Sequence, residues 1–511
     1  MSTPTKIPHT APEGSNASNG TAAPAKTVSM WTLVSLIIGS TVGAGIFALP
    51  QNAASVAAPG AMLIGWAIAG IGMLSIAFVF QVLALRKPHL DSGVYSYVRA
   101  GLGDFVGFAS AWGYWLGSVI AQVGYATLFF STLGHYIPFF STENRLTSGI
   151  AVSILTWVIF FMLTRGVKQA ALMNVITTVA KLLPILSFLV LVAFIGFSWD
   201  KFTFDFWGRG GESGSVIDQI KAFMLFTVWT FIGVEGASVY SKQARKRSDV
   251  GRATVIGFFS VLALLVSVTT LSFGVMTQQE LAALGDNSLA AVLEAVIGPW
   301  GGALVSFGLM FSVLGAYVSW QMLCAEPILL MGMDGLLPSR FGKLNKHGSP
   351  FSAQLVSTIV IQLCVIVFFM NEATYSFMVQ LATIMYMLPY VFSSLYLVLL
   401  TTRGRGMTHP HAGTRFDDSG PVVAGAENRR HLAIGSVALV YSLWLFYAAD
   451  PRYLFLACLL VIPGLVPYVW TRMAARERIF NAFEWVIVAL VVLGGIYAVY
   501  GLSTGALSFS S

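Results

Sequence analysis

The chain has 511 residues, of which 56% are hydrophobic and only 10% are charged. A soluble domain carries about 25% charged residues, so this composition excludes an ordinary soluble protein and indicates a polytopic membrane protein. The net charge of +7 does not indicate nucleic-acid binding, because the basic residues are spread through short loops between apolar runs. The expected partner is therefore the lipid bilayer and not nucleic acid.

The chain begins with a polar segment and continues as a series of apolar runs. Residues 1–27 are rich in Ser, Thr, Pro, Ala, Asn and Gly, which predicts a disordered tail. No cleavable signal precedes the first apolar run, so we expect it to remain as the first membrane helix. About thirteen runs reach the roughly 20 residues that cross a bilayer. They lie at about 29–54, 60–85, 104–134, 146–164, 169–198, 216–240, 251–276, 300–331, 351–371, 375–402, 431–449, 452–471 and 482–502.

Basic residues alternate between the connections of these runs. The even-numbered connections hold most of the Lys and Arg residues, whereas the odd-numbered ones hold few among acids such as Asp200, Asp205, Glu280 and Asp286. Positive charge marks the cytoplasmic side of membrane proteins. We therefore expect a multi-pass protein of the cytoplasmic membrane with its N-terminus, including the tail, in the cytoplasm and its C-terminus outside.

The first apolar run contains the stretch GSTVGAGIF at residues 39–47. Three glycines in seven residues favour an unwound segment where a continuous helix is otherwise expected. Freed backbone groups at that depth cost several kcal/mol each, so a polar ligand between two half-helices is one interpretation. The other is a close helix contact, since Gly39 and Gly43 form a GxxxG pair. The stretch alone leaves both interpretations open.

Three ionisable residues fall inside the predicted spans: Lys181, Glu235 and Glu326. A charge within the membrane costs about 3 kcal/mol or more, which makes each one a functional candidate. Glu235 follows Gly233 and precedes Gly236, so it marks a second glycine-flanked interruption. Glu326 lies nearer the end of its run, where an interfacial or packing role fits equally well.

The two interruptions fall in the first and the sixth apolar runs. Broken helices at matching positions of two halves are typical of transporters that bind their substrate at the membrane midplane. This spacing predicts that the first five and the next five helices form two inverted repeats, with the last three helices as additions.

Several motifs in the same order resemble the amino acid/polyamine/organocation superfamily. They are the stretch 39–50, DSGVY at 91–95, WTFIGVEGAS at 229–238 and KRSDVG at 246–251. Together they cover nearly the whole chain and are most similar to the basic amino acid antiporters, such as arginine/ornithine antiporters and related lysine transporters. The resemblance implies a LeuT-like fold with residues 28–402 as the transport core, 403–430 as a cytoplasmic loop and 431–511 as additional helices.

The resemblance also implies where a substrate binds. Its carboxylate is expected at the backbone amides of Ala44 and Gly45, where a half-helix begins. Its ammonium is expected at backbone carbonyls around Thr41, Trp229 and Ile232, which the broken helices leave free. The full set expected to bind substrate is Thr41, Gly43, Ala44, Gly45, Trp229, Ile232, Gly233 and Trp320.

The resemblance assigns separate roles to two tryptophans. Trp229 resembles the aromatic gate of the family, and Trp320 resembles the residue that stacks on the aliphatic side chain of the substrate. Packing or anchoring at the membrane interface is the alternative for any membrane tryptophan. The family's contribution from the third helix, within Trp112–Ser118, is not assigned to a residue.

The charged residues leave the mode of transport open. Lys181 resembles a lysine that proton-coupled members carry in the fifth helix, and we group it with Glu235 and Glu326 as candidates for coupling or gating. Exchange of arginine, ornithine or lysine by alternating access is the expected function. Proton-coupled uptake or export of lysine or arginine is the alternative. The expected partners are cationic amino acids, with a homodimer as an option, and no cofactor or metal is expected.

Other membrane functions fit the sequence less well. The histidines lie in tails, loops or span ends, which argues against an intramembrane hydrolase. A glycine-rich phosphate loop followed by Lys and Ser or Thr does not occur, which argues against ATP-driven transport. No ring of like charges or carbonyl repeat indicates a channel.

Overall fold

The computed structural model describes residues 29–87, 90, 93–140, 144–165, 170–210, 214–234, 247–371, 374–403 and 423–508. Every regular element in these ranges is helical, which confirms the predicted all-α class. The predicted tail, Glu235 and most of the predicted loop 403–430 lie outside the described residues.

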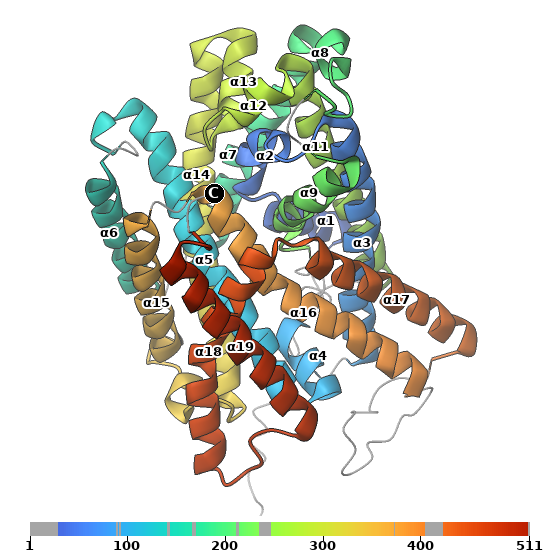
Figure 1. Cartoon of the computed structure of the whole chain (residues 1–511), viewed down its shortest axis with the longest axis vertical. Helices are drawn as coiled ribbons and strands as arrows, with labels where there is room; N and C mark the ends of the chain where they lie inside the picture. Colours follow the sequence, from blue (N-terminus) through green and yellow to red (C-terminus); the bar gives the residue numbers. More distant parts are fainter. Residues whose placement is uncertain are drawn as a thin grey trace, which may run out of the picture.

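The helices are those of a membrane protein rather than of a globular core (Figure 1). The first part of the chain forms α1 (Met30–Thr41), α2 (Gly45–Ala54), α3 (Pro59–Arg86), α4 (Gly93–Leu102), α5 (Asp104–Tyr136), η1 (Pro138–Phe140), α6 (Arg145–Thr164), α7 (Ala170–Leu191) and the π-helical η2 (Val192–Gly196). The middle forms α8 (Trp199–Thr203), α9 (Val216–Phe231), α11 (Arg247–Val275), α12 (Gln278–Ala282), α13 (Ser288–Ile297), α14 (Pro299–Met333), η4 (Ser339–Gly342), α15 (Phe351–Met370) and α16 (Tyr375–Arg403). The last part forms α17 (Gly425–Ala448), α18 (Pro451–Ala474) and α19 (Ala482–Thr504).

The lengths of the helices repeat between the two halves of the core. The long helices α3 and α11 have 28 and 29 residues, and the short helices α4 and α13 have 10 each. The next pair, α5 and α14, has 33 and 35 residues, and α6 and α15 have 20 each. Figure 1 shows α4 and α13 at opposite ends of the molecule, as an inverted repeat requires. We refer to these ends as the α4 end and the α13 end.

The number of membrane crossings is smaller than predicted within the described residues. Eleven of the described helices are long and apolar enough to span a bilayer, or twelve when α1 and α2, which bend by 54°, count as one broken span. The remaining predicted span, at 216–240, corresponds to α9, which has only 16 residues before the described chain stops at residue 234. The count of thirteen therefore stays a prediction.

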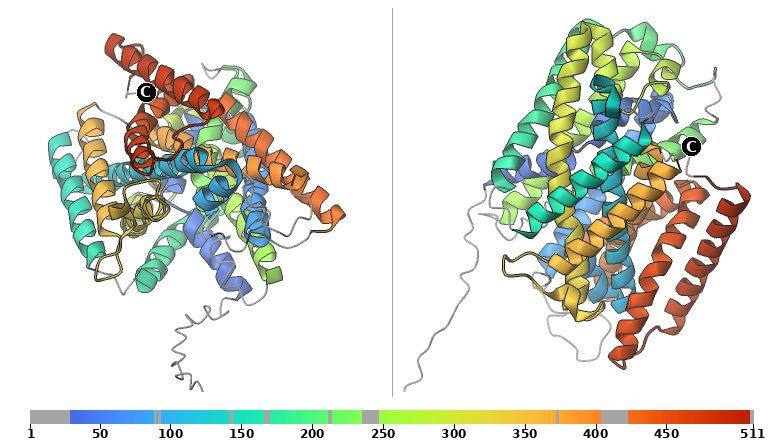
Figure 2. Two further views of the ribbon diagram at one scale, coloured as in Figure 1. Left: turned by 90° about the horizontal axis from the view of Figure 1, so that it is seen from below. Right: turned by 90° about the vertical axis from the view of Figure 1, so that its left-hand side faces the viewer.

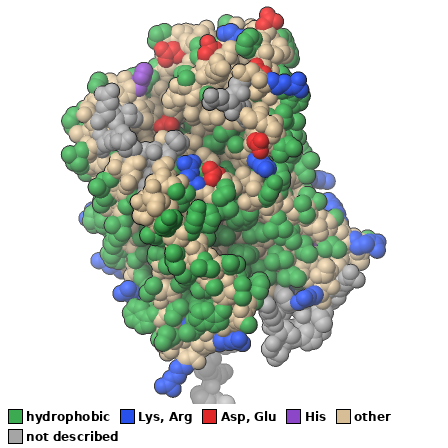
Figure 3. All heavy atoms as spheres, viewed as in Figure 1, with side chains coloured by type: hydrophobic (Ala, Val, Ile, Leu, Met, Phe, Trp, Pro, Cys, Tyr) green, Lys and Arg blue, Asp and Glu red, His purple; other side chains and the backbone are tan. Residues whose placement is uncertain are grey.

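The helix α5 forms the centre of the bundle and contacts both α14 and α16. In contrast, α18 and α19 pack mainly against each other and lie along one side of the molecule in both views of Figure 2. Hydrophobic side chains cover the middle of the face in Figure 3, where acidic side chains appear only towards the α13 end. This apolar belt is the surface that a bilayer covers.

The helix α17 begins earlier than the predicted run at 431. Its first turn is polar, but the side chain of Asn428 is buried and bonded to two other helices. It accepts a hydrogen bond from Arg86 at 2.9 Å and donates one to the carbonyl of Thr401 at 2.8 Å. These bonds extend the helix to Gly425, because tertiary contacts and not hydropathy determine its start.

Candidate functional site

The first span is interrupted where the sequence predicts it. The helix α1 ends at Thr41, because the next residue, Val42, leaves the helical region with ψ of 89°. The helix α2 begins at Gly45, and its N-cap residue Ala44 provides no side-chain hydrogen bond. The amides of Gly45 and Ile46 in the first turn are therefore available to a negatively charged or polar group.

A second interruption meets the first. The helix α9 ends at Phe231, and the turn that follows places Gly233 at φ of +105°, a conformation that favours glycine. A Cβ atom at Gly233 would lie 2.7 Å from the carbonyl oxygen of Ser40. The Ser40 hydroxyl in turn donates to the carbonyl of Gly233 at 3.3 Å. The two breaks thus touch, and only glycine allows this approach.

A small cavity lies beside the two breaks, with a volume of about 20 Å³. Its lining comes from α1, α2, α5, α9, α11, α14 and α16 and consists of Ser40, Thr41, Val42, Gly43, Gly45, Ile46, Ala121, Tyr125, Trp229, Thr230, Ile232, Leu265, Trp320 and Tyr386. The hydroxyl of Thr41 is buried and has no hydrogen-bond partner among the described residues. An unsatisfied buried hydroxyl facing a cavity is what a polar ligand completes.

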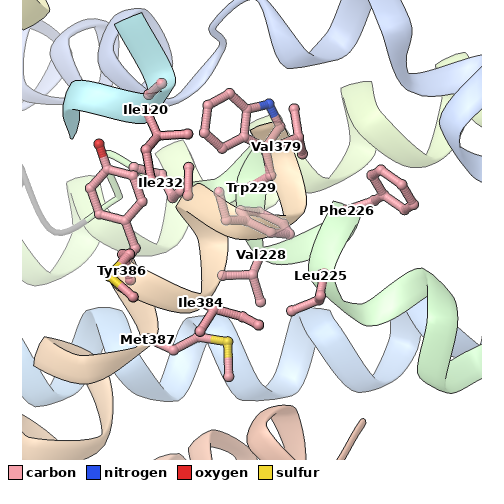
Figure 4. Packing of buried hydrophobic residues seen from close by; sticks show 14 of the residues in the cluster. Ile120, Leu225, Phe226, Val228, Trp229, Ile232, Val379, Ile384, Tyr386 and Met387 are labelled. Carbon is pink, nitrogen blue, oxygen red and sulfur yellow. The ribbon is translucent and has the colours of Figure 1, made fainter. Parts of the chain in front are cut away.

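Aromatic rings form the walls of this cavity. A Cβ atom at Gly45 would lie 2.7 Å from the indole nitrogen of Trp229, so the glycine lets this ring lie directly against the break. The centroid of Trp229 is 6.0 Å from that of Tyr125, and the centroids of Trp320 and Tyr386 are 6.2 Å apart. Figure 4 shows Trp229 and Tyr386 among the buried residues around this space. The cavity therefore offers backbone groups on one side and ring faces on the other.

The sequence that forms this site has relatives among known proteins. A sequence profile for amino acid permeases matches residues 28–449. The chain belongs to the amino acid permease family. It is 65% identical to the L-lysine transport protein of Corynebacterium glutamicum, over 97% of this chain and 99% of that protein. It is 44% identical to the arginine/ornithine antiporter of Pseudomonas aeruginosa, over 93% and 97%. Identity to the arginine/agmatine antiporter of Chlamydia abortus is 33%, over 95% and 99%.

The matches confirm the superfamily that the motifs resemble. Because the family consists of permeases and the relatives are transporters or antiporters, this permease is a multi-pass transporter and not an enzyme.

The structure of the permease brings together most residues expected to bind substrate. Those that line the cavity are Thr41, Gly43, Gly45, Trp229, Ile232 and Trp320. The remaining two are adjacent to it: Ala44 is the N-cap of α2, and Gly233 packs against the carbonyl of Ser40.

Other cavity residues were not predicted from the sequence of the permease. From α5, the residues that line the cavity are Ala121 and Tyr125, which follow the window 112–118 in which a contribution was expected. From α16 comes Tyr386, whose hydroxyl donates to Ser118 at 2.9 Å. A tyrosine within an apolar run is the one local signal that Tyr125 and Tyr386 share, since an aromatic ring with a polar tip suits a ligand site.

Lys181 lies beside the break and not in the cavity lining. This side chain from α7 is only 7% exposed, and its ammonium donates to the carbonyl of Gly39 in the last turn of α1. A carbonyl at a helix C-terminus carries partial negative charge, which stabilises a cation there. The ammonium of Lys181 therefore lies at the end of α1, next to the break in the first span.

Of the two glutamates grouped with Lys181 as candidates for coupling or gating, only Glu326 lies within the described residues. Glu326 is exposed on the surface of α14 and does not line the cavity, although it follows Trp320 by less than two turns. Glu235 lies outside the described residues.

Proposed function

We propose that this permease carries basic amino acids across the cell membrane, exchanging one for another by alternating access. The observation that carries this proposal is the small aromatic cavity where the two broken helices meet. The names of the relatives, which are a lysine transport protein and antiporters of arginine, support the choice of substrate.

The cavity accounts for each part of such a substrate. The α-carboxylate binds at the amides of Gly45 and Ile46, where the N-terminus of α2 favours an anion. The α-ammonium donates to the free hydroxyl of Thr41 and to nearby carbonyls. The aliphatic chain and its cationic end lie along the rings of Trp320 and Tyr386, which attract a cation through their faces.

The described lining of the cavity favours recognition of a cation by aromatic rings. Among the described residues that line it, none is acidic. The cationic end of the substrate therefore depends on ring faces and backbone carbonyls, which act strongly where water is excluded.

The volume of the cavity supports gating. A space of about 20 Å³ holds about one water molecule and no amino acid. Trp229 or a neighbouring wall must therefore move to admit a substrate. Because Trp229 lies against Gly45 and next to Tyr125, its ring is the part that we expect to act as the gate.

The orientation follows from the distribution of charge. In this proposal the α4 end faces the cytoplasm and the α13 end faces outwards, because Lys and Arg mark the cytoplasmic side of membrane proteins and Arg86, Arg99 and Arg472 lie at the α4 end.

Proton-coupled transport is the second candidate, and one observation favours it. The ammonium of Lys181 donates directly to α1 at its last turn. If this lysine released its proton during the cycle, the bond to the carbonyl of Gly39 would weaken and movement of α1 would follow the proton. Lys181→Met should then remove any effect of a pH gradient on uptake, whereas a pure exchanger shows no such effect in either form.

Exchange in proteoliposomes tests the proposal. Liposomes loaded with arginine, lysine or ornithine should take up labelled arginine much faster than unloaded ones, and leucine inside should give no such stimulation. Trp320→Ala should raise the KM for arginine by about 5- to 100-fold, since loss of the ring contact costs roughly 1–3 kcal/mol. Trp444→Ala, which removes a tryptophan of α17 that lies outside the cavity lining, is the control. Equal uptake by loaded and unloaded liposomes would refute exchange.

A further inference from the structure

A groove separate from the cavity lies at the α4 end. It is bounded by the start of α1, the last turns of α3, and the starts of α11 and α17, and its volume is about 540 Å³. Its walls are apolar and include Phe78, Val82, Leu85, Val255 and Ile434. The groove is therefore large enough for an alkyl chain, in contrast to the cavity of about 20 Å³.

Two arginines from different helices line the same groove. Arg252 and Arg430 each lie five residues after the first residue of their helix, about 7.5 Å along the axis. Neither guanidinium forms an ion pair or a hydrogen bond with a described residue. A guanidinium near the end of a membrane helix lies at the boundary between hydrocarbon and headgroups.

The charges around the groove leave an excess of positive charge. Arg86 and Arg430 both act electrostatically on His431, and Glu427 is the acid that faces the same ring. The carboxylate of Glu427 lies 3.8 Å from the Nε2 atom of His431, so it is directed at the imidazole. In the described lining of the groove, two arginines, Arg252 and Arg430, therefore outnumber one acid, Glu427.

Two buried polar atoms of the lining have no partner. His431 is 8% exposed, and its Nδ1 atom makes no hydrogen bond to a described residue. The Oε1 atom of Gln81, from the facing helix α3, is also buried without a partner. A buried polar atom without a partner destabilises the protein unless a ligand or water completes it. An apolar groove with unsatisfied polar atoms beside free arginines indicates an amphiphilic ligand.

We propose that this groove binds an anionic phospholipid of the leaflet at the α4 end. Its phosphate lies between Arg252 and Arg430, its glycerol and headgroup oxygens meet Gln81 and His431, and an acyl chain follows the apolar walls. Basic pockets between membrane helices on the cytoplasmic side have the charge that lipid headgroups of this kind require. A free phosphate ion would leave the apolar walls unfilled. Since Met30 also lines the groove, the lipid would contact the start of α1 as well as α11 and α17.

Lipid retention by the full-length protein tests this proposal. The purified protein is stripped of lipid, mixed with phosphatidylglycerol or with phosphatidylcholine of the same chains, and examined by native mass spectrometry and thermal unfolding. Phosphatidylglycerol should be retained at least fivefold more than phosphatidylcholine and should raise the unfolding midpoint. Combined Arg252→Gln and Arg430→Gln substitutions should abolish this preference without lowering the midpoint of the lipid-free protein.

Two further variants make the result specific. Arg165→Gln with Arg429→Gln removes two exposed arginines of the α4 end that do not line the groove, and it should keep the preference. Ile256→Trp leaves both arginines in place but fills part of the groove, and it should reduce retention of phosphatidylglycerol. Equal retention of the two lipids, full retention by the arginine double variant, or displacement of the lipid by millimolar inorganic phosphate would overturn the proposal. Retention of neither lipid, which would mean that another part of the chain fills the groove, would overturn it too.

Discussion

The short helices α4 and α13 occupy equivalent positions in the two repeats, yet they are attached in different ways. At the α4 end, Tyr95 donates to Asp334 at 2.7 Å, and Arg99 pairs with Asp334 at 2.7 Å and with Asp104 at 2.8 Å. Arg472 of α18 also donates to Asp104 at 3.0 Å. Charged groups therefore bind α4 to the long helices α5 and α14, and α18 joins the same network.

The hydrogen bonds of α13 itself are neutral. The hydroxyl of Ser288 accepts from the amide of Gln51 at 3.1 Å and donates to the carbonyl of Phe47 at 3.3 Å. The amide of Asn287 donates to Ser306 at 2.9 Å, and the adjacent carboxylate of Asp286 has no ion pair or hydrogen bond with a described residue. These bonds attach α13 chiefly to α2, which is part of the broken span, and not to the long helices alone.

The two short helices differ in how firmly they are held, so the two ends differ in how readily they open from this conformation. Charge-assisted hydrogen bonds contribute about 1.5–3 kcal/mol each, and neutral ones about 0.5–1.5 kcal/mol. The α4 end is therefore held more firmly than the α13 end. Because α13 contacts α2, we expect that any movement of the broken span on substrate binding is transmitted directly to the α13 end.

The largest effect is expected from Asp334→Ala. This change removes the partner of Tyr95 and one of the two partners of Arg99, and it should weaken closure of the α4 end by roughly 2 kcal/mol or more, which is at least tenfold in a conformational equilibrium. Hydrogen exchange of the α4 amides should rise at least tenfold, and turnover in proteoliposomes should fall. Asp205→Ala is the control, because Asp205 also accepts two hydrogen bonds, but only from backbone amides of its own loop at 2.9 and 3.0 Å. Unchanged exchange in α4 would contradict the comparison.

A smaller effect in the same direction is expected from Tyr95→Phe. Burial raises the pKa of the Tyr95 phenol, so the hydroxyl stays protonated and donates to Asp334 at every physiological pH. The substitution removes that single bond and leaves the Arg99 pair intact, which should cost about 1.5 kcal/mol. Hydrogen exchange in α4 should increase less than in Asp334→Ala. An equal increase in the two variants would show that the ion pair between Arg99 and Asp334 does not help to hold α4.

At the opposite end, Asp286→Asn is expected to stabilise the protein. Burial raises the pKa of the Asp286 carboxyl to about 6, above its ordinary value of 3.8. The ionised carboxylate therefore costs stability, a cost that builds between about pH 4 and 6 and is complete above pH 6. The asparagine variant should unfold at a higher temperature at pH 7, with a gain of about 1–2 kcal/mol, and at the same temperature at pH 4. A gain in stability that persists at pH 4 would show that it does not arise from the ionised carboxylate of Asp286.

The smallest effect is expected from Ser288→Ala. It removes two long neutral hydrogen bonds between α13 and α2, so closure of the α13 end should weaken by about 1 kcal/mol. Hydrogen exchange in α13 should rise a few-fold while exchange in α4 stays unchanged. Transport should remain close to that of the parent protein. A loss as large as that of Asp334→Ala would reverse the ranking of the two ends.

Local sequence signals predicted the parts of the site that are locally determined. Glycines broke the first span between Thr41 and Gly45 as expected, because backbone freedom is a property of the residues themselves. Trp229 and Trp320 reached the cavity because their spacing from motifs of the family is fixed along one helix each. The order and approximate lengths of the long core helices followed from hydropathy in the same way, whereas the short helices α4 and α13 were not predicted.

Features that depend on packing between helices were not predictable in this way. The apolar runs of α5 and α16 each contain several tyrosines, so a tyrosine alone does not indicate which turn of each helix faces the cavity; packing selects Tyr125 and Tyr386. Glu326 illustrates the reverse case: its charge marks it as unusual, but the rotation of α14 places it on the surface. The polar start of α17 was missed because Asn428 is paired with residues far away in the chain.

The small volume of the central cavity has a consequence for the electrical insulation of the membrane. A space of about 20 Å³ accommodates about one water molecule, so no file of hydrogen-bonded water can run through the closed protein at that point. Without such a file, neither protons nor small ions can follow the route that the solute takes. In the exchange proposed above, the protein can therefore turn over many times without discharging the gradients on which the cell depends.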